Sequence, residues 1–284
     1  IPIPKFSKEF SKRISALILE SDNALRESTA LYSSAQSILS SRLGQVPKDT
    51  RNTTTRKLSE VFSTGRLDAE YFMPKYDGLF ALLDTLPTKP LGEIVSITKS
   101  IEPGSSYYTA EGIPFIRVSD ITTMGISSPE IHIPHDTVPD IEKLYPQKDT
   151  VLLSKDGSVG IAYKVDEDLQ AVTSGALLHL NVKDTDEIMP DYLALVLNSE
   201  IVQLQAERDT NGAIIQHWRL EDIAKVIIPI LDADTQNSIA HNVQRSFSFR
   251  RQSEHLIASA VKAVELAVES GETFAVNYLN ALES

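Results

Sequence analysis

The feature that most constrains this fold is a stretch of about forty residues that occurs twice, near each end of the chain. The second copy lies 225 positions after the first, without a gap, and both show small and apolar residues at heptad spacing. Such spacing marks one face of a long helix, and the small residues allow a partner helix to approach closely. Each copy is therefore the expected partner of the other, in place of two unrelated surface helices. The residues expected at this helix–helix interface are Ile14, Ser21, Leu25, Ser28, Ala35, Ile239, Ser246, Ser253, Ile257 and Ala260.

The helix signals set the expected limits of the two copies. Ser7 is the expected N-cap of the first helix, which should end near Gly44, and Asp234 is the expected cap of the second, which should end near Gly271. An α+β fold follows, in which a β-rich domain is inserted between two long helices that pair as an antiparallel coiled coil. The predicted segments are a long helix (1–46), a linker (47–57), a β-rich domain (58–230), and a second long helix with an apolar tail that docks (231–284).

The insert alternates short β-type runs with turn residues and a few helices. Pro74 begins one predicted helix, and Pro190 begins another that should run without a break to about Gln205. Trp218 is expected in the core and Arg117 in a structural ion pair. The strand candidates are residues 93–98, 113–118, 130–134, 150–154, 160–165, 176–182 and 226–230.

Composition narrows the class of protein. The chain has 284 residues, no cysteine and a net charge of −12, of which −11 falls within residues 51–230. A protein this acidic is not a general polyanion binder, so any role on nucleic acid needs a local basic face or partners that supply positive charge. No signal peptide or long apolar run is seen, which favours a cytoplasmic protein with no membrane contact. The chain starts at Ile1, inside the repeated unit, so a fragment or processed product is expected.

Catalytic signatures are missing from the sequence. The Gly157–Gly160 segment lies between two strand candidates and is better explained as a hairpin turn than as a phosphate-binding loop. His132 and His135 have no third ligand at suitable spacing, so we expect no metal site. Motifs of adenine methyltransferases, nucleases and serine hydrolases are also missing. The sequence therefore predicts that this chain is not an enzyme by itself.

Three polar loops carry the residue types that contact DNA. Lysine ammonium groups suit phosphate oxygens, whereas arginine, asparagine and glutamine match base edges. These loops follow strand ends, where a rigid scaffold commonly positions binding residues, so they should converge on one side of the insert. Each side chain taken singly could also be an ordinary exposed loop residue. The candidate DNA contacts are Lys99, Ser105, Ser106, Tyr107, Tyr108, Lys155, Ser158, Arg208, Asn211, Gln216 and Arg219.

The order of these parts resembles a type I restriction-modification specificity subunit. The resemblance rests on GRLDAEYF at 65–72, LLSKDGSVGIA at 152–162, and the VIIPI run at 226–230 that leads into a long helix containing Gln236. That family repeats a unit of one target-recognition domain and one conserved long helix, and the 225-residue repeat matches this tandem. A complete subunit has two recognition domains and this chain has one, so it resembles the C-terminal half or a shortened form.

The resemblance implies a non-catalytic reader of one half of a split site in double-stranded DNA. It implies two modification subunits docked on the helices, which carry S-adenosylmethionine and methylate adenine, and a restriction subunit that uses ATP and Mg²⁺. No cofactor is expected in this chain, and a prokaryotic cytoplasm is the expected location. Self-association through the long helices stays open. Alternatives are a specificity chain of another modification system, a coiled-coil adaptor whose insert binds protein, and an enzyme with an unfamiliar site in the polar loops.

Overall fold

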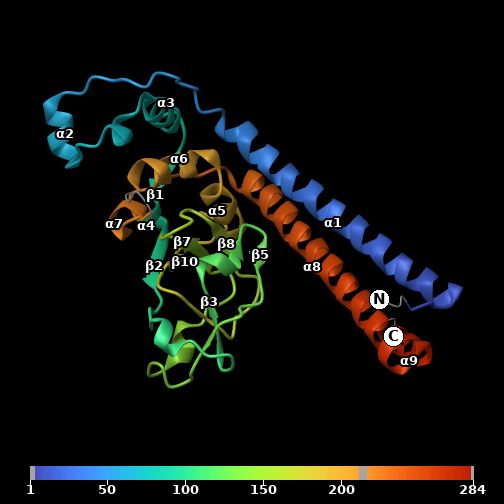
Figure 1. Ribbon diagram of the computed structural model, residues 1–284. Helices are drawn as coiled ribbons and strands as arrows, with labels where there is room; N and C mark the ends of the chain where they lie inside the picture. The colour runs from blue at the N-terminus through green and yellow to red at the C-terminus, as the bar shows by residue number, and fades with distance from the viewer. Residues whose placement is uncertain (1–3, 211–215, 283–284) are drawn as a thin grey trace. The chain divides into compact units, whose positions relative to one another are not determined.

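The computed structural model describes residues 4–210 and 216–282, and the chain divides into two compact units. One unit comprises Ile1–Ala35 and His241–Ser284, and the other comprises Gln36–Ala240. Figure 1 shows the long helices α1 (Lys8–Leu43) and α8 (Ala233–Ser270). By residue number, each contributes to both units. The fold is α+β, with a β-rich domain between two long helices.

The helical unit holds α1 and α8 antiparallel through serine pairs. The Ser21 hydroxyl donates to the carbonyl of Ser253 at 3.0 Å, and the Ser246 hydroxyl donates to the carbonyl of Ser28 at 2.7 Å. The repeat superposes Ser21 on Ser246 and Ser28 on Ser253, so exchanging the two copies converts one pair into the other. The helix pair therefore has an approximate internal two-fold axis. The predicted seam residues Ser21, Ser28, Ala35, Ile239, Ser246, Ser253 and Ala260 are buried, and Ile14 is half-buried.

Two residues predicted for the seam lie outside it. Leu25 is 41% exposed and Ile257 is 42% exposed, whereas one position earlier Ala24 is buried and Leu256 is half-buried. Ala24 and Leu256 follow the seam serines Ser21 and Ser253 by three residues, whereas Leu25 and Ile257 follow them by four, so the seam uses the three-residue step of the heptad. The seam prediction is therefore wrong by one residue at these two positions.

The helix ends follow the predicted signals, with one correction. The Ser7 hydroxyl accepts the Phe10 backbone N–H, and Gly44 and Gly271 end the two helices in the left-handed region, at φ of 81° and 94°. The N-cap of α8 is Asp232 and not Asp234, because the Asp232 carboxylate accepts both the backbone N–H and the hydroxyl of Thr235.

The tail forms a short helix that packs on the helical unit. Helix α9 (Glu272–Leu282) buries Ala275 and Leu279 against Phe10 and neighbouring residues of α1 and α8. The Glu272 carboxylate accepts the backbone N–H of Ser7 at 2.6 Å, which places a negative charge at the start of α1.

The larger unit is organised around a four-stranded antiparallel sheet in the order β2-β10-β7-β8. The strands of a three-stranded sheet, β6-β3-β9, alternate with them along the chain, and the described residues also form two strand pairs, β1-β11 and β4-β5. The strands are β1 (Thr88–Pro90), β2 (Val95–Lys99), β3 (Ile113–Ile116), β4 (Ile121–Thr122), β5 (Gly125–Ile126), β6 (His132–Ile133), β7 (Val151–Ser154), β8 (Ala162–Lys164), β9 (Val172–Thr173), β10 (Leu177–Val182) and β11 (Ile227–Pro229).

Short helices surround these sheets, and α5 packs on β7 and β8 with nearly every side chain buried. They are α2 (Leu58–Thr64), η1 (Ala69–Phe72), α3 (Pro74–Leu83), α4 (Leu91–Ile94), η2 (Ser105–Tyr107), η3 (Val118–Asp120), η4 (Ile141–Leu144), α5 (Pro190–Leu197), α6 (Glu200–Asp209) and α7 (Leu220–Ile223).

The helix predicted after Pro190 is in fact two helices, α5 and α6. The break falls at Asn198 and Ser199 because the Asn198 side chain bonds to the strand β8 instead of to solvent. Its carbonyl oxygen accepts the Ala162 N–H at 3.0 Å, and its amide donates to the Ala162 carbonyl at 2.7 Å. Asn198 thus supplies hydrogen-bond partners to the backbone of Ala162 on the edge strand β8. The helical periodicity of the sequence does not predict this bonding.

Candidate nucleic-acid interface

Parts of the three predicted contact loops meet at one end of the four-stranded sheet. Strand β2 ends at Lys99, which pairs with Leu178 near the start of β10, and β7 ends at Ser154, which pairs with Leu177. The loops that leave these strands therefore begin next to one another. We call this place the sheet end, and define it by Lys99, Ser154–Gly160, Gly175 and Gln216–Arg219.

The turn from β7 to β8 is the hairpin that the sequence predicted. Gly157 and Gly160 have φ of 75° and 87°, which side chains with a Cβ rarely adopt. The Ser154 hydroxyl donates to the carbonyl of Ser158 at 2.6 Å and accepts the N–H of Ile161 at 2.8 Å. These bonds hold the turn internally, so the glycines serve its geometry and not a phosphate cradle.

The segment that follows α6 returns to this turn. The Gly157 N–H donates to the Gln216 carbonyl at 3.0 Å, and the Trp218 N–H donates to the Lys155 carbonyl at 2.8 Å. Trp218 is only 1% exposed, as predicted, so its ring fixes the returning segment in the core. Gln216 and Arg219 are exposed on either side of it. The structure therefore brings the turn and the Gln216–Arg219 segment together, as the sequence predicted.

Asp156 ties the two segments through its side chain. One carboxylate oxygen accepts the Lys155 ammonium, and the other lies 2.8 Å from His217 Nδ1. Burial would raise the pKa of Asp156, but the hydrogen bonds from Lys155 and His217 outweigh it and lower that pKa. The Lys155 side chain is 15% exposed, so a DNA phosphate would compete with Asp156 for its ammonium.

Lys99 is exposed at the same sheet end, beside Gly175. The Gly175 N–H donates to the Ile101 carbonyl at 2.7 Å and lies 3.1 Å from a Glu102 carboxylate oxygen. A Cβ on Gly175 would come within 2.9 Å of the Lys99 stem, so glycine lets the lysine lie close to the backbone there.

The Ser105–Tyr108 stretch belongs to the neighbouring three-stranded sheet. Tyr108 packs on Phe115 with ring centroids 5.6 Å apart and is half-buried, whereas Ser105, Ser106 and Tyr107 are exposed. The stretch connects to the sheet end through Ile101, which bridges to Ser174. Its exposed hydroxyls stay candidates, while the Tyr108 ring has a packing role.

Arg208 is occupied inside the protein. Its guanidinium carbon lies 4.0 Å from the centroid of the Tyr71 ring and 4.6 Å from that of Phe80, and it donates to the Tyr71 hydroxyl at 2.5 Å. Arg66 also lies over Tyr71, at 4.7 Å. These contacts fasten the GRLDAEYF segment to α6, so the expectation that Arg208 reads a base edge gives way to a structural role.

The remaining predicted contacts are Ser158, which is exposed in the β7–β8 turn, Arg219 and Asn211. Arg219 pairs with Asp222 at 2.8 Å, and Arg117 pairs with Asp120 at 3.5 Å, the latter as predicted. Asn211 lies outside the described residues. Sequence reasoning missed Asp156 and His217, which are 61 positions apart, and the only local signal was the Asp-Gly turn itself.

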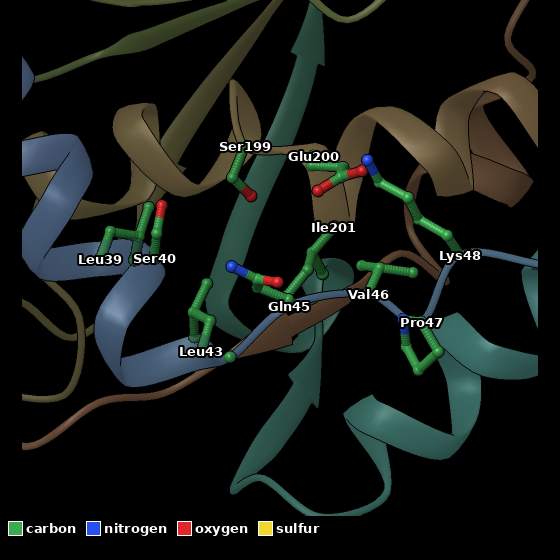
Figure 2. Close-up of a pocket in the computed structure, with 11 residues that line it drawn as sticks. Leu39, Ser40, Leu43, Gln45, Val46, Pro47, Lys48, Ser199, Glu200 and Ile201 are labelled. Atoms are coloured by element: carbon green, nitrogen blue, oxygen red, sulfur yellow. The ribbon is translucent and has the colours of Figure 1, made fainter.

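A cavity of about 650 Å³ lies elsewhere in the same unit, between the end of α1, the linker and the start of α6 (Figure 2). Its walls combine apolar side chains such as Leu39, Leu43 and Ile201 with polar ones that include Lys48 and Glu200. The lining residues contain no histidine or paired carboxylates, which acid–base catalysis commonly uses.

The described ranges, 4–210 and 216–282, lack two further features. They contain no group of three histidine or carboxylate side chains that could hold a metal ion. Within the same residues, none of the helices has the length and apolarity to cross a membrane.

Comparison with known proteins gives a family. A family model described as the type I restriction modification DNA specificity domain matches residues 85–257, more than half of the chain. No curated protein matches the chain. Similar solved structures include the S subunit of a type I restriction-modification system from M. genitalium, at 18% identity and a TM-score of 0.48, covering 64% of this chain and 44% of that one.

Two further structures cover more of the chain. The HsdS subunit from Thermoanaerobacter tengcongensis is 16% identical, with a TM-score of 0.44 over 95% of this chain and 60% of that one. A chain from work on complex assembly and conformational transition of the type I R-M system is 18% identical, with a TM-score of 0.43 over 95% and 61%. This chain therefore spans between 44% and 61% of the length of the structures that it matches.

Proposed function

The chain belongs to the family of type I restriction modification DNA specificity domains, and we propose that it is the non-catalytic DNA-recognition subunit of a type I restriction-modification complex. The family match over residues 85–257 carries this proposal, because it spans the sheet end and continues into α8. The β-rich domain reads one half of a bipartite site in double-stranded DNA, and the long helices dock the adenine methyltransferase subunits.

The geometry of the sheet end supports a reading role. Loops held by a rigid scaffold are the usual place for binding residues, and here the four-stranded sheet holds Lys99 and the β7–β8 turn, to which Gln216–Arg219 is hydrogen-bonded. Lys99 is the better phosphate contact, since its ammonium is exposed, and Gln216 is the better base contact, since its amide can bond both N6 and N7 of adenine.

The approximate two-fold axis of the helix pair supports the docking role. Repeated surfaces related by such an axis offer two equivalent places to two copies of one partner. The serine pairs show that the repeat extends to individual hydrogen bonds. Two modification subunits bound in this way would each carry S-adenosylmethionine, and a restriction subunit would add the ATP- and Mg²⁺-dependent steps.

The net charge of −11 in residues 51–230 favours one rival function, a coiled-coil adaptor whose insert binds protein. A gel-shift titration of a random-sequence duplex separates the two functions, with the chain alone, the modification subunit alone and both together. We expect a sharp shift with both, because the partner supplies the missing positive charge. An unchanged shift on adding the chain would favour the adaptor, and methyl transfer by the chain alone would favour an enzyme.

A further inference from the structure

In the Lys155–Asp156–His217 cluster at the sheet end, the exposed side chain is His217, and its neighbours fix its hydrogen-bonding state. His217 is 61% exposed, whereas Asp156 is 24% and Lys155 is 15% exposed. The three groups come from two segments that the backbone already joins, through the bridge between Asp156 and His217 and through the buried Trp218. The imidazole therefore projects from a fixed base and not from a free loop.

The carboxylate decides which ring nitrogen carries the proton. An ionised carboxylate only accepts hydrogen bonds, so the 2.8 Å contact requires a proton on His217 Nδ1. In the neutral ring, Nε2 is then a hydrogen-bond acceptor. The pKa of Asp156 is lowered, in keeping with an ionised partner.

An exposed acceptor at this place selects among the groups of DNA. Phosphate oxygens are acceptors too, so neutral Nε2 gains nothing from them. In the major groove the donors are the N6 amino group of adenine and the N4 amino group of cytosine, whereas guanine and thymine offer acceptors. His217 is therefore suited to base amino groups, whereas Lys99 is suited to phosphate oxygens.

We propose that His217 reads a base amino group through Nε2, and that Asp156 is its positioning residue, fixing the ring and its tautomer. The inference rests on the proposed function and adds a specificity-determining residue to it. Two other histidines of this domain give a contrast. His179 is 8% exposed and bonds to Thr173 at 2.8 Å, and burial lowers its pKa to about 4. His135 is exposed, and its Pro134–Thr137 turn is outside the sheet end, which makes it a matched control.

The test is a selection from a random duplex library at mildly alkaline pH, with the chain reconstituted with its modification subunit. We expect a consensus that holds adenine or cytosine at one position and loses that preference about fivefold in His217→Ala, the worth of one hydrogen bond. All other positions of the consensus should persist. His135→Ala should leave the whole consensus unchanged.

The positioning role of Asp156 is tested by measurements that a purely structural role would leave unchanged. Asp156→Ala should lose the same base preference, and Asp156→Asn should restore part of it, because the amide oxygen still accepts the Nδ1 proton. Imidazole ¹⁵N spectra of the free chain should show His217 protonated on Nδ1 in the parent and shifted toward Nε2 in Asp156→Ala.

The outcomes distinguish this inference from the proposed function. A parent complex that selects a consensus which His217→Ala leaves intact at every position overturns the role of His217 alone. A His217 ring protonated on Nε2 in the parent overturns the role of Asp156. If the parent complex selects no consensus, the proposed function fails, and the inference fails with it.

Discussion

The serine seam offers the sharpest test of the helical unit, because its symmetry predicts equal effects at residues far apart in sequence. The Ser21 hydroxyl has one proton, which it gives to the Ser253 carbonyl at 3.0 Å. The 2.8 Å contact between the two hydroxyls must then be donated by Ser253. The same chain of bonds runs from Ser28 to Ser246 and back to the Ser28 carbonyl.

These roles predict a pattern of four alanine substitutions. Ser21→Ala or Ser246→Ala removes two hydrogen bonds and leaves a buried hydroxyl without its acceptor, at a cost of about 1–3 kcal/mol. Ser28→Ala or Ser253→Ala removes one bond, at about 0.5–1.5 kcal/mol. Alanine also gains about 0.5 kcal/mol of helix propensity, so each value is taken relative to Ser15→Ala on the exposed face of α1.

Urea unfolding followed by far-ultraviolet circular dichroism measures these differences. The two members of each symmetry-related pair should agree within about 0.5 kcal/mol, the usual error of additivity for separate sites. Enlarging Ser28 or Ser253 to leucine should cost about 1–3 kcal/mol by overpacking the closed seam. Alanine variants all as stable as Ser15→Ala, or leucine variants as stable as the parent, would refute the close-packed seam.

Three further perturbations test the larger unit and the tail. Lys164→Met should cost about 3–5 kcal/mol in urea unfolding, since the Lys164 ammonium lies 3.1 Å from Asp191, whose side chain is only 6% exposed; an unchanged midpoint would contradict this. Burial raises the pKa of Asp209 to about 6, whereas the unfolded carboxyl titrates near 3.8, so its contribution should fall as pH rises from about 4 to 6. Asp209→Asn should remove that part of the slope and stabilise the protein at neutral pH, and an unaltered pH profile would argue against a buried carboxyl. Glu272→Gln should speed amide exchange in the first turn of α1, because Ser7 loses a charged acceptor; unchanged exchange would show that α9 does not cap this helix.

The sequence predicted those features that depend on residues near one another. The heptad serines, the Ser7 cap, the glycines that end the long helices and the Gly157–Gly160 hairpin all follow from local spacing, and the structure has each of them. The two-residue strand β9 had no such signal, because its pairing with β3 is parallel and distant in sequence.

The candidate site was predictable in place but not in detail. The sequence located the loops at the sheet end, yet it could not show that Lys155 gives its ammonium to Asp156 or that Arg208 packs on Tyr71. Arg208 and Tyr71 are 137 positions apart, and no local spacing in the sequence predicts that they meet. His217 was missed for the same reason, because its candidate role depends on its contact with the Asp156 carboxylate, which is distant in sequence.

The central claim, that this chain supplies the DNA specificity of a methyltransferase complex, is tested most directly by mapping N6-methyladenine. A type I modification subunit from the same source is expressed in a host without other adenine methylation, with and without this chain, and the genomic DNA is sequenced for methylated positions. We predict methylated adenines within one defined sequence motif only when the chain is present. Methylation at the same positions without the chain would contradict the claim, as would no methylation when a stable complex of the two subunits is recovered from the same cells.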